Sequence, residues 1–175
     1  AAAAELVKPG QRIILDTGTT TLELAYSLRG GEKLTVVTTS LAIVSALLPA
    51  PGVKCMLLGG TVRETSPDLY GPLVEENLAR IHADIAFVGC DGLSDEGQLT
   101  TTDHRVARAT QLMIANASRA VLLTDSSKAG RSSFVTFAKL EDLEVIISDR
   151  DLPRRTRDLA RKAGTEVITV KPDAH

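Results

Sequence analysis

The architecture of this chain is set by residues 12–23, which read Arg12-Ile13-Ile14-Leu15-Asp16-Thr17-Gly18-Thr19-Thr20-Thr21-Leu22-Glu23. The apolar run at its start is typical of a strand buried on both faces. Thr20 followed by Glu23 three residues later fits a capping box, so we expect a helix to begin there. A strand that runs through a glycine-containing turn into a capped helix predicts a parallel α/β sheet.

The same alternation continues to the end of the chain. Short runs rich in Val, Ile and Leu predict strands at 12–15, 34–37, 53–58, 85–88, 120–123, 145–147 and 166–170. The segments between them predict helices, and Leu41, Val44 and Leu48 suggest the apolar side of the second one. Residues 58–71 break the rhythm with turns and a small strand excursion, and residues 134–139 are also non-helical. We therefore expect a single domain over residues 5–175.

Composition excludes several classes of function. The 175 residues are 43 % apolar, carry a net charge of −2, and include no Trp, two Tyr and three Phe. This balance argues against nucleic-acid or membrane binding by the chain itself. No apolar run is long enough to span a membrane and no signal peptide is visible, so we expect a cytoplasmic protein with Cys55 and Cys90 as free thiols.

The loop after the first strand is the strongest candidate for a binding site. Gly18 allows close backbone approach, and Thr19, Thr20 and Thr21 supply hydroxyl and N–H groups at a helix N-terminus. The alternative is simply a well-capped helix start, but capping requires only one hydroxyl. The loop lacks the Lys of a P-loop and the glycine spacing of a dinucleotide site, so we expect it to bind the phosphate of a small molecule.

Two later loops also follow strands and lie at the same edge of the expected sheet. Residues 89–102 place carboxylates among glycines, which suits sugar hydroxyls but equally suits an acidic turn in which Thr101 or Thr102 caps the next helix. Residues 124–130 carry Lys128, which is either an ordinary surface lysine or a point charge for a phosphate. His82 and His104 stand alone without metal-ligand spacing, so we predict no metal site.

These loops, in this order, resemble the C-terminal domain of the DeoR family of bacterial transcription regulators. The matching segments are ILDTGTTT at 14–21, VVTTSL at 36–41, LLGG at 57–60, AFVGCDG at 86–92, LTT at 99–101 and TDSSK at 124–128. The resemblance implies a three-layer, Rossmann-like parallel sheet similar to that of ribose-5-phosphate isomerase and the coenzyme A transferases. It also implies an effector-sensing domain of a repressor that binds a phosphorylated sugar or polyol without a cofactor.

The resemblance assigns roles to individual residues. The phosphate group is assigned to Gly18, Thr19, Thr20, Thr21 and Lys128, and the sugar to Asp16, Ser40, Asp91, Gly92, Thr100 and Thr101. Full-length members of the family bind DNA through an N-terminal winged helix-turn-helix, which nothing before Leu6 supplies here. Such a regulator is expected to be a homo-oligomer, a dimer or a tetramer, because DNA operators with two-fold symmetry favour symmetric DNA-binding proteins.

Two enzymatic functions are alternatives to effector sensing, and the sequence departs from the pattern that each of them requires. An aldose–ketose isomerase would use Asp91 or Asp95 as its base, but after Glu96 the chain has no Glu before Glu141. A coenzyme A transferase needs a Glu nucleophile in a glycine-rich turn, which the sequence lacks. We therefore expect no enzyme. Arg105 and Arg108 are either a basic lining for a second anionic group or a solvated helix face, and the Arg-rich residues 150–162 read as a solvated helix.

Overall fold

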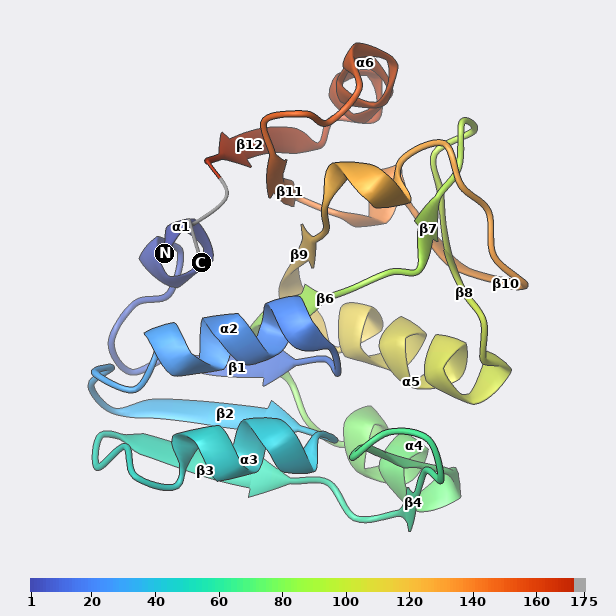
Figure 1. The fold of residues 1–175 in the computed structure, drawn as a ribbon. Coiled ribbons are helices and arrows are strands. Elements are labelled where there is room, and N and C mark those ends of the chain that lie inside the picture. Colours follow the sequence, from blue (N-terminus) through green and yellow to red (C-terminus); the bar gives the residue numbers. More distant parts are fainter. Residues whose placement is uncertain (172–175) are drawn as a thin grey trace.

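A seven-stranded parallel sheet forms the centre of the computed structural model, which describes residues 1–171 (Figure 1). Its spatial order is β12-β11-β9-β6-β1-β2-β3, and every pair of neighbours is parallel. The strands are β1 (Arg12–Leu15), β2 (Leu34–Thr38), β3 (Val53–Leu57), β6 (Ala83–Val88), β9 (Ala117–Leu123), β11 (Val145–Asp149) and β12 (Glu166–Val170). All seven predicted strands are confirmed. The predicted domain end at residue 175 lies outside the described residues.

Helices cover both faces of this sheet and give the three predicted layers. On one face lie α1 (Ala2–Glu5), α2 (Thr19–Ser27) and α3 (Leu41–Leu47), and on the other α4 (Pro72–Ala79), α5 (His104–Ala115) and α6 (Arg154–Lys162). Alternation within the strands serves both layers, since Ile13 and Leu15 pack toward the first set of helices and Ile14 toward the second. Each fully buried side chain of this kind contributes about 1.5–3 kcal/mol of transfer free energy.

Two small antiparallel sheets stand beside the main sheet. The predicted excursion is a hairpin of β4 (Thr61–Val62) and β5 (Leu69–Tyr70). The other sheet has the order β10-β8-β7 and consists of β7 (Gly92–Leu93), β8 (Gln98–Thr101) and β10 (Val135–Lys139). The sequence predicted a small strand excursion in residues 58–71, but it predicted neither its pairing as a hairpin nor the three-stranded sheet. Two short 3₁₀ helices, η1 (Ser126–Lys128) and η2 (Leu140–Asp142), complete the described structure.

The start of α2 differs from the predicted capping box. Gly18 is the N-cap, with φ of 137°, and no side chain caps the helix. The Thr21 hydroxyl donates to the Gly18 carbonyl at 3.0 Å instead. The prediction that the helix begins with a Thr20 cap is therefore wrong, because a positive φ at Gly18 lets the chain enter the helix earlier. As a result, the first N–H groups of α2 are not capped by a side chain.

Two other local predictions also needed correction. In α3 the buried side is Ile43, Ala46 and Leu47, whereas Leu41 and Leu48 are exposed. In α5 the cap is Asp103, whose side chain accepts from the Arg105 N–H, and neither Thr101 nor Thr102 caps it. In both helices several residues could have filled the position, as the buried apolar face of α3 or as the cap of α5. Packing against the rest of the chain selects among them.

Candidate functional site

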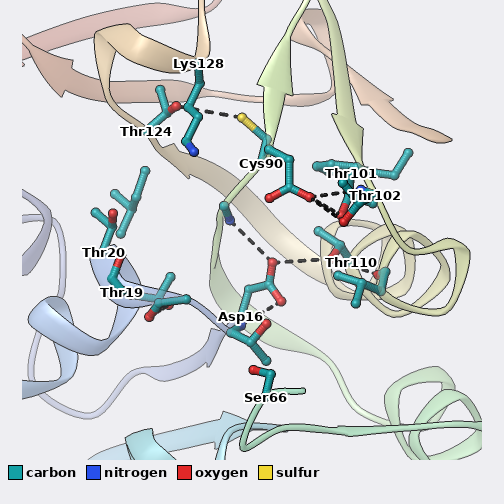
Figure 2. Close-up of a pocket in the computed structure, with 18 of the residues that line it drawn as sticks. Asp16, Thr19, Thr20, Ser66, Cys90, Thr101, Thr102, Thr110, Thr124 and Lys128 are labelled. Atoms are coloured by element: carbon teal, nitrogen blue, oxygen red, sulfur yellow. Dashed lines mark hydrogen bonds between the residues drawn. The ribbon is translucent and has the colours of Figure 1, made fainter. Parts of the chain in front are cut away.

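A cavity of about 420 Å³ opens where β1, β6 and β9 end. These three strands are neighbours in the sheet, so the loops that follow them converge on one space, as expected at the carboxyl edge of a parallel sheet. Figure 2 shows Thr19, Thr20, Asp16, Lys128 and Ser66 arranged around it. The residues that line the cavity are Asp16, Thr17, Gly18, Thr19, Thr20, Thr21, Arg63, Ser66, Gly89, Cys90, Asp91, Thr101, Thr102, Val106, Thr110, Leu123, Thr124, Asp125, Lys128 and Phe137.

The loop after β1 presents the N-terminus of α2 to this cavity. Thr19 and Thr20 are exposed, while Thr21 is buried and braces the turn through its bond to Gly18. Within residues 1–171 the N–H groups of residues 18–21 find no hydrogen-bond partner. Uncapped N–H groups at the positive end of a helix dipole favour an anion. The predicted cradle residues therefore lie together on the cavity wall.

Asp16 is the buried carboxylate at the base of the cavity. Its Oδ1 accepts from the Thr17 N–H at 2.7 Å, and its Oδ2 accepts from the Gly89 N–H at 3.4 Å and the Thr110 hydroxyl at 3.3 Å. Burial raises the pKa of Asp16 to about 6, despite these hydrogen bonds, which act in the opposite direction. Asp16 thus joins the cradle loop to the loop after β6 and to α5 (Figure 2).

Asp91 lies on the loop after β6, and hydrogen bonds from the end of β8 and the residue that follows it hold its side chain. Its Oδ2 accepts from the Thr101 hydroxyl at 2.8 Å and from the N–H and hydroxyl of Thr102 at 2.9 and 3.2 Å. Burial alone raises the pKa of Asp91, but these hydrogen bonds outweigh it and leave the pKa below its ordinary value. All three bonds are made by one oxygen, so Oδ1 keeps its capacity to accept from a ligand hydroxyl.

Lys128 stands at the end of η1, after β9. It lines the cavity with Thr124 and Asp125, and the Asp125 carboxylate accepts from the Ser127 N–H at 2.8 Å to fix the turn. Lys128 makes no ion pair within the described part of the chain. Its ammonium group is consequently available to a ligand anion.

Sequence reasoning placed three residues at the site that do not line the cavity. The Ser40 hydroxyl caps α3 by accepting from the Ile43 N–H at 3.3 Å. Gly92 is packed so tightly that a Cβ there would lie 2.6 Å from the Arg131 carbonyl oxygen. The Thr100 hydroxyl donates to the Gly92 carbonyl at 3.1 Å. These residues support the walls from behind.

The structure also brings in residues that the sequence did not single out. Arg63 and Ser66 reach the cavity from the β4–β5 hairpin, and Thr110 reaches it from α5. Cys90 lines it as well, and burial raises the pKa of its thiol to about 11, which favours the protonated thiol over the thiolate. The hairpin residues depend on long-range packing, and no local motif marks them.

Several polar residues that the sequence left open lie outside the cavity lining. Arg105 pairs with Asp103 at 2.7 Å and stacks on Tyr70, and Arg108 lies 3.5 Å from Glu75. Both therefore belong to a charged helix face. Within residues 1–171 no group of three metal-ligating side chains forms a metal site. None of the helices described there is long and apolar enough to cross a membrane.

The geometry defines a class: an α/β domain with an uncapped helix N-terminus in a polar cavity, as small-molecule-binding domains have. Residues 1–150 match the family described as the DeoR C-terminal sensor domain, and the chain belongs to that family. The sequence-based assignment is confirmed.

Relatives among curated proteins are transcription regulators. A protein of Escherichia coli O157:H7 named as a transcriptional repressor of the aga operon is 38 % identical over 169 residues, which cover 97 % of this chain and 63 % of the relative. The repressor GlcR of Bacillus subtilis (strain 168) is 33 % identical over 171 residues, covering 98 % of this chain and 66 % of GlcR. The chain thus spans about two thirds of their length.

The predicted likeness to ribose-5-phosphate isomerase is confirmed at the level of the fold. A structure of that isomerase in complex with phospho-erythronic acid superposes with a TM-score of 0.53 and 16 % sequence identity. The match covers 73 % of this chain and 50 % of the isomerase.

Proposed function

We propose that the cavity binds a phosphorylated sugar or polyol as an effector, without turning it over. Binding would modulate the DNA affinity of the full-length regulator. We assign DNA binding to the part of the relatives that extends beyond the matched region, since the net charge of −2 gives this chain no general attraction to DNA.

The observation that carries the proposal is the pairing of an uncapped helix N-terminus with an unpaired lysine on one cavity. Residues 18–21 offer backbone N–H groups and the exposed hydroxyls of Thr19 and Thr20, and Lys128 offers a full positive charge. A phosphate dianion satisfies all of these at once. The match supports a phosphate more than a carboxylate, which has too few oxygens for this number of donors.

The rest of the cavity suits the hydroxyl groups of a sugar. Asp16 and Asp91 keep acceptor capacity, and hydroxyl-bearing side chains line the space between them. The neighbouring fold of an isomerase solved with phospho-erythronic acid, a phosphorylated polyhydroxy acid, supports the same ligand class.

Turnover is disfavoured by the state of Asp91 and Asp95, the two bases that the sequence offered. Asp16, whose pKa is raised to about 6, is the remaining candidate base, and three hydrogen bonds hold its carboxylate. Asp95 is paired with Arg155 at 3.2 Å and does not line the cavity. Asp91 has a lowered pKa, which makes it a weak base, and no Glu or His is among the lining residues. The naming of the relatives as transcription regulators supports the same conclusion.

Control of DNA binding requires the effector to favour one of two arrangements of the full-length protein. We infer that this protein is a homo-oligomer, dimer or tetramer, because a symmetric regulator matches a two-fold operator. Sedimentation of the full-length regulator with and without effector measures both its size and any change in it.

The direct test is a thermal-shift screen against sugar and polyol phosphates, with unphosphorylated sugars and inorganic phosphate as controls. A ligand at about 100 times its Kd adds about 2.7 kcal/mol, which raises Tm by about 5–10 °C in a domain of this size. Lys128→Ala and Thr20→Val should reduce the shift. Lys139→Ala should not, because Lys139 is exposed and pairs with Glu141 on the surface.

Failure of the folded wild-type domain to respond to every phosphorylated compound refutes the proposed ligand class. The proposal that the domain does not turn over its ligand is refuted if the wild type isomerises the sugar phosphate that it binds and if Asp16→Asn or Asp91→Asn loses that activity.

A further inference from the structure

Arg63 faces the cavity from the β4–β5 hairpin and has no part in the phosphate cradle. Its side chain is only 19 % exposed. Its Nε and Nη2 donate to Asp68 Oδ1 at 3.2 and 3.0 Å, and Nη2 also lies 3.0 Å from Asp68 Oδ2. The Asp68 carboxylate is itself buried, so this fork fixes the guanidinium plane.

The remaining nitrogen of Arg63 is free to contact a ligand. Nη1 lies 3.9 Å from Asp103 Oδ2, which is beyond hydrogen-bonding distance, and makes no hydrogen bond within residues 1–171. It carries two N–H groups on a residue that lines the cavity. Ser66, from the same hairpin, lies across the cavity from Lys128 in Figure 2.

The charges around Arg63 determine which kind of ligand oxygen its N–H groups can bind. Asp68 and Asp103 carry two negative charges, which balance the positive charges of Arg63 and Arg105. Arg105 pairs with Asp103 at 2.7 Å and lowers its pKa to about 2, so this group of side chains has no net positive charge. Asp91 and Asp125 add further negative charge to the same cavity. A second phosphate at the hairpin end would therefore meet no excess of positive charge, whereas a neutral hydroxyl or carbonyl oxygen meets two free donors.

Resting on the function proposed above, we propose that Arg63 contacts an uncharged oxygen of the effector and so selects monophosphorylated over bisphosphorylated sugars. The phosphate binds at the α2 N-terminus and Lys128, and the hydroxyl or carbonyl end of the same molecule binds Arg63. Selectivity thus resides in the hairpin, while general anion affinity resides in the loop after β1.

The test is calorimetric titration of the domain with three matched pairs of probes and with inorganic phosphate. The pairs are fructose 6-phosphate and fructose 1,6-bisphosphate, glucose 6-phosphate and glucose 1,6-bisphosphate, and ribose 5-phosphate and ribulose 1,5-bisphosphate. For the monophosphate that binds tightest, its bisphosphate should bind at least about 10-fold more weakly.

The variant for this test is the double substitution Arg63→Gln with Asp68→Asn. It replaces a charged pair by a neutral one and avoids leaving Asp68 buried without a partner. Loss of a charged hydrogen bond predicts about 10- to 100-fold weaker binding of that monophosphate, with inorganic phosphate affinity unchanged. The matched control is Arg108→Gln with Glu75→Gln, an ion pair outside the cavity lining, which should change neither.

The outcomes separate the two proposals. If the wild type binds a monophosphate and the Arg63 variant binds it equally well, or if the bisphosphate binds more tightly, the role of Arg63 is refuted while the effector proposal stands. If the wild type binds neither inorganic phosphate nor any monophosphate, the effector proposal fails and the role of Arg63 fails with it.

Discussion

The burial of Asp16 predicts how the free energy of unfolding depends on pH, and this dependence can be measured. In the folded chain burial raises its pKa to about 6 from 3.8. Between these values the folded state holds a proton that the unfolded state has released, so stability falls as pH rises. The contribution is fully present below about pH 4 and is lost as pH rises through about 6. At neutral pH the ionised Asp16 therefore destabilises the fold.

The magnitude follows from the two pKa values. One pKa unit corresponds to about 1.4 kcal/mol, so the ionised carboxylate costs about 3 kcal/mol at pH 7.5. The neutral variant Asp16→Asn removes this cost. Its oxygen can still accept from the Thr17 N–H, and the Thr110 hydroxyl can turn to accept from its amide, but the 3.4 Å bond from the Gly89 N–H is lost. Allowing about 1 kcal/mol for that bond, Asp16→Asn should be about 2 kcal/mol more stable than the wild type.

Urea unfolding followed by far-ultraviolet circular dichroism measures this difference, since the chain has no Trp for fluorescence. The advantage of Asp16→Asn should be about 2 kcal/mol at about pH 7.5 and should shrink by roughly half or more at about pH 5, where the wild-type carboxyl is mostly protonated. Other titrating groups cancel because both proteins contain them. An advantage of the same size at both pH values, or a destabilised variant at pH 7.5, would refute the account of Asp16.

Three further substitutions test the support around the cavity. Gly92→Ala places a Cβ 2.6 Å from a backbone oxygen and should lower the free energy of unfolding by about 1–3 kcal/mol, whereas Gly59→Ala, where the space is open, should be neutral in the same urea titration. Ser40→Ala should cost about 1 kcal/mol through loss of the α3 cap and leave inorganic phosphate affinity unchanged by calorimetry. Asp91→Asn, which cannot accept as the carboxylate does from Thr102, should weaken sugar phosphate binding by about 10-fold and leave inorganic phosphate affinity nearly intact.

The sequence predicts the central sheet well because buried parallel strands are continuous apolar runs, which are legible locally. The strands β8 and β10 escaped prediction for the opposite reason. Gln98–Thr101 and Val135–Lys139 mix polar and apolar residues, and each pairs with a partner far along the chain. Their pairing is decided by tertiary context, which a local pattern does not record.

The candidate site also contains residues that a local sequence pattern predicts and residues that only long-range packing brings there. The cradle at residues 18–21 was predicted because a glycine and three threonines before a helix are a local signal, although the cap itself lies at Gly18. Arg63 was not, because its position depends on backbone bonds that join the hairpin to the end of β2. The Leu41 N–H donates to the Pro67 carbonyl and the Leu69 N–H to the Thr39 carbonyl, both at 2.9 Å.

This division has a functional consequence. In the proposed binding mode, the part of the site that is encoded locally binds the phosphate, which is common to all candidate effectors. The part that depends on long-range packing then contacts the portion of the ligand that distinguishes one sugar from another. If the proposal holds, substitutions in residues 59–71 change which sugar phosphate is bound and leave the phosphate cradle intact, because the side-chain bonds of Arg63 go to Asp68 and not to residues 18–21. Selectivity and anion affinity are thus separable properties of this cavity.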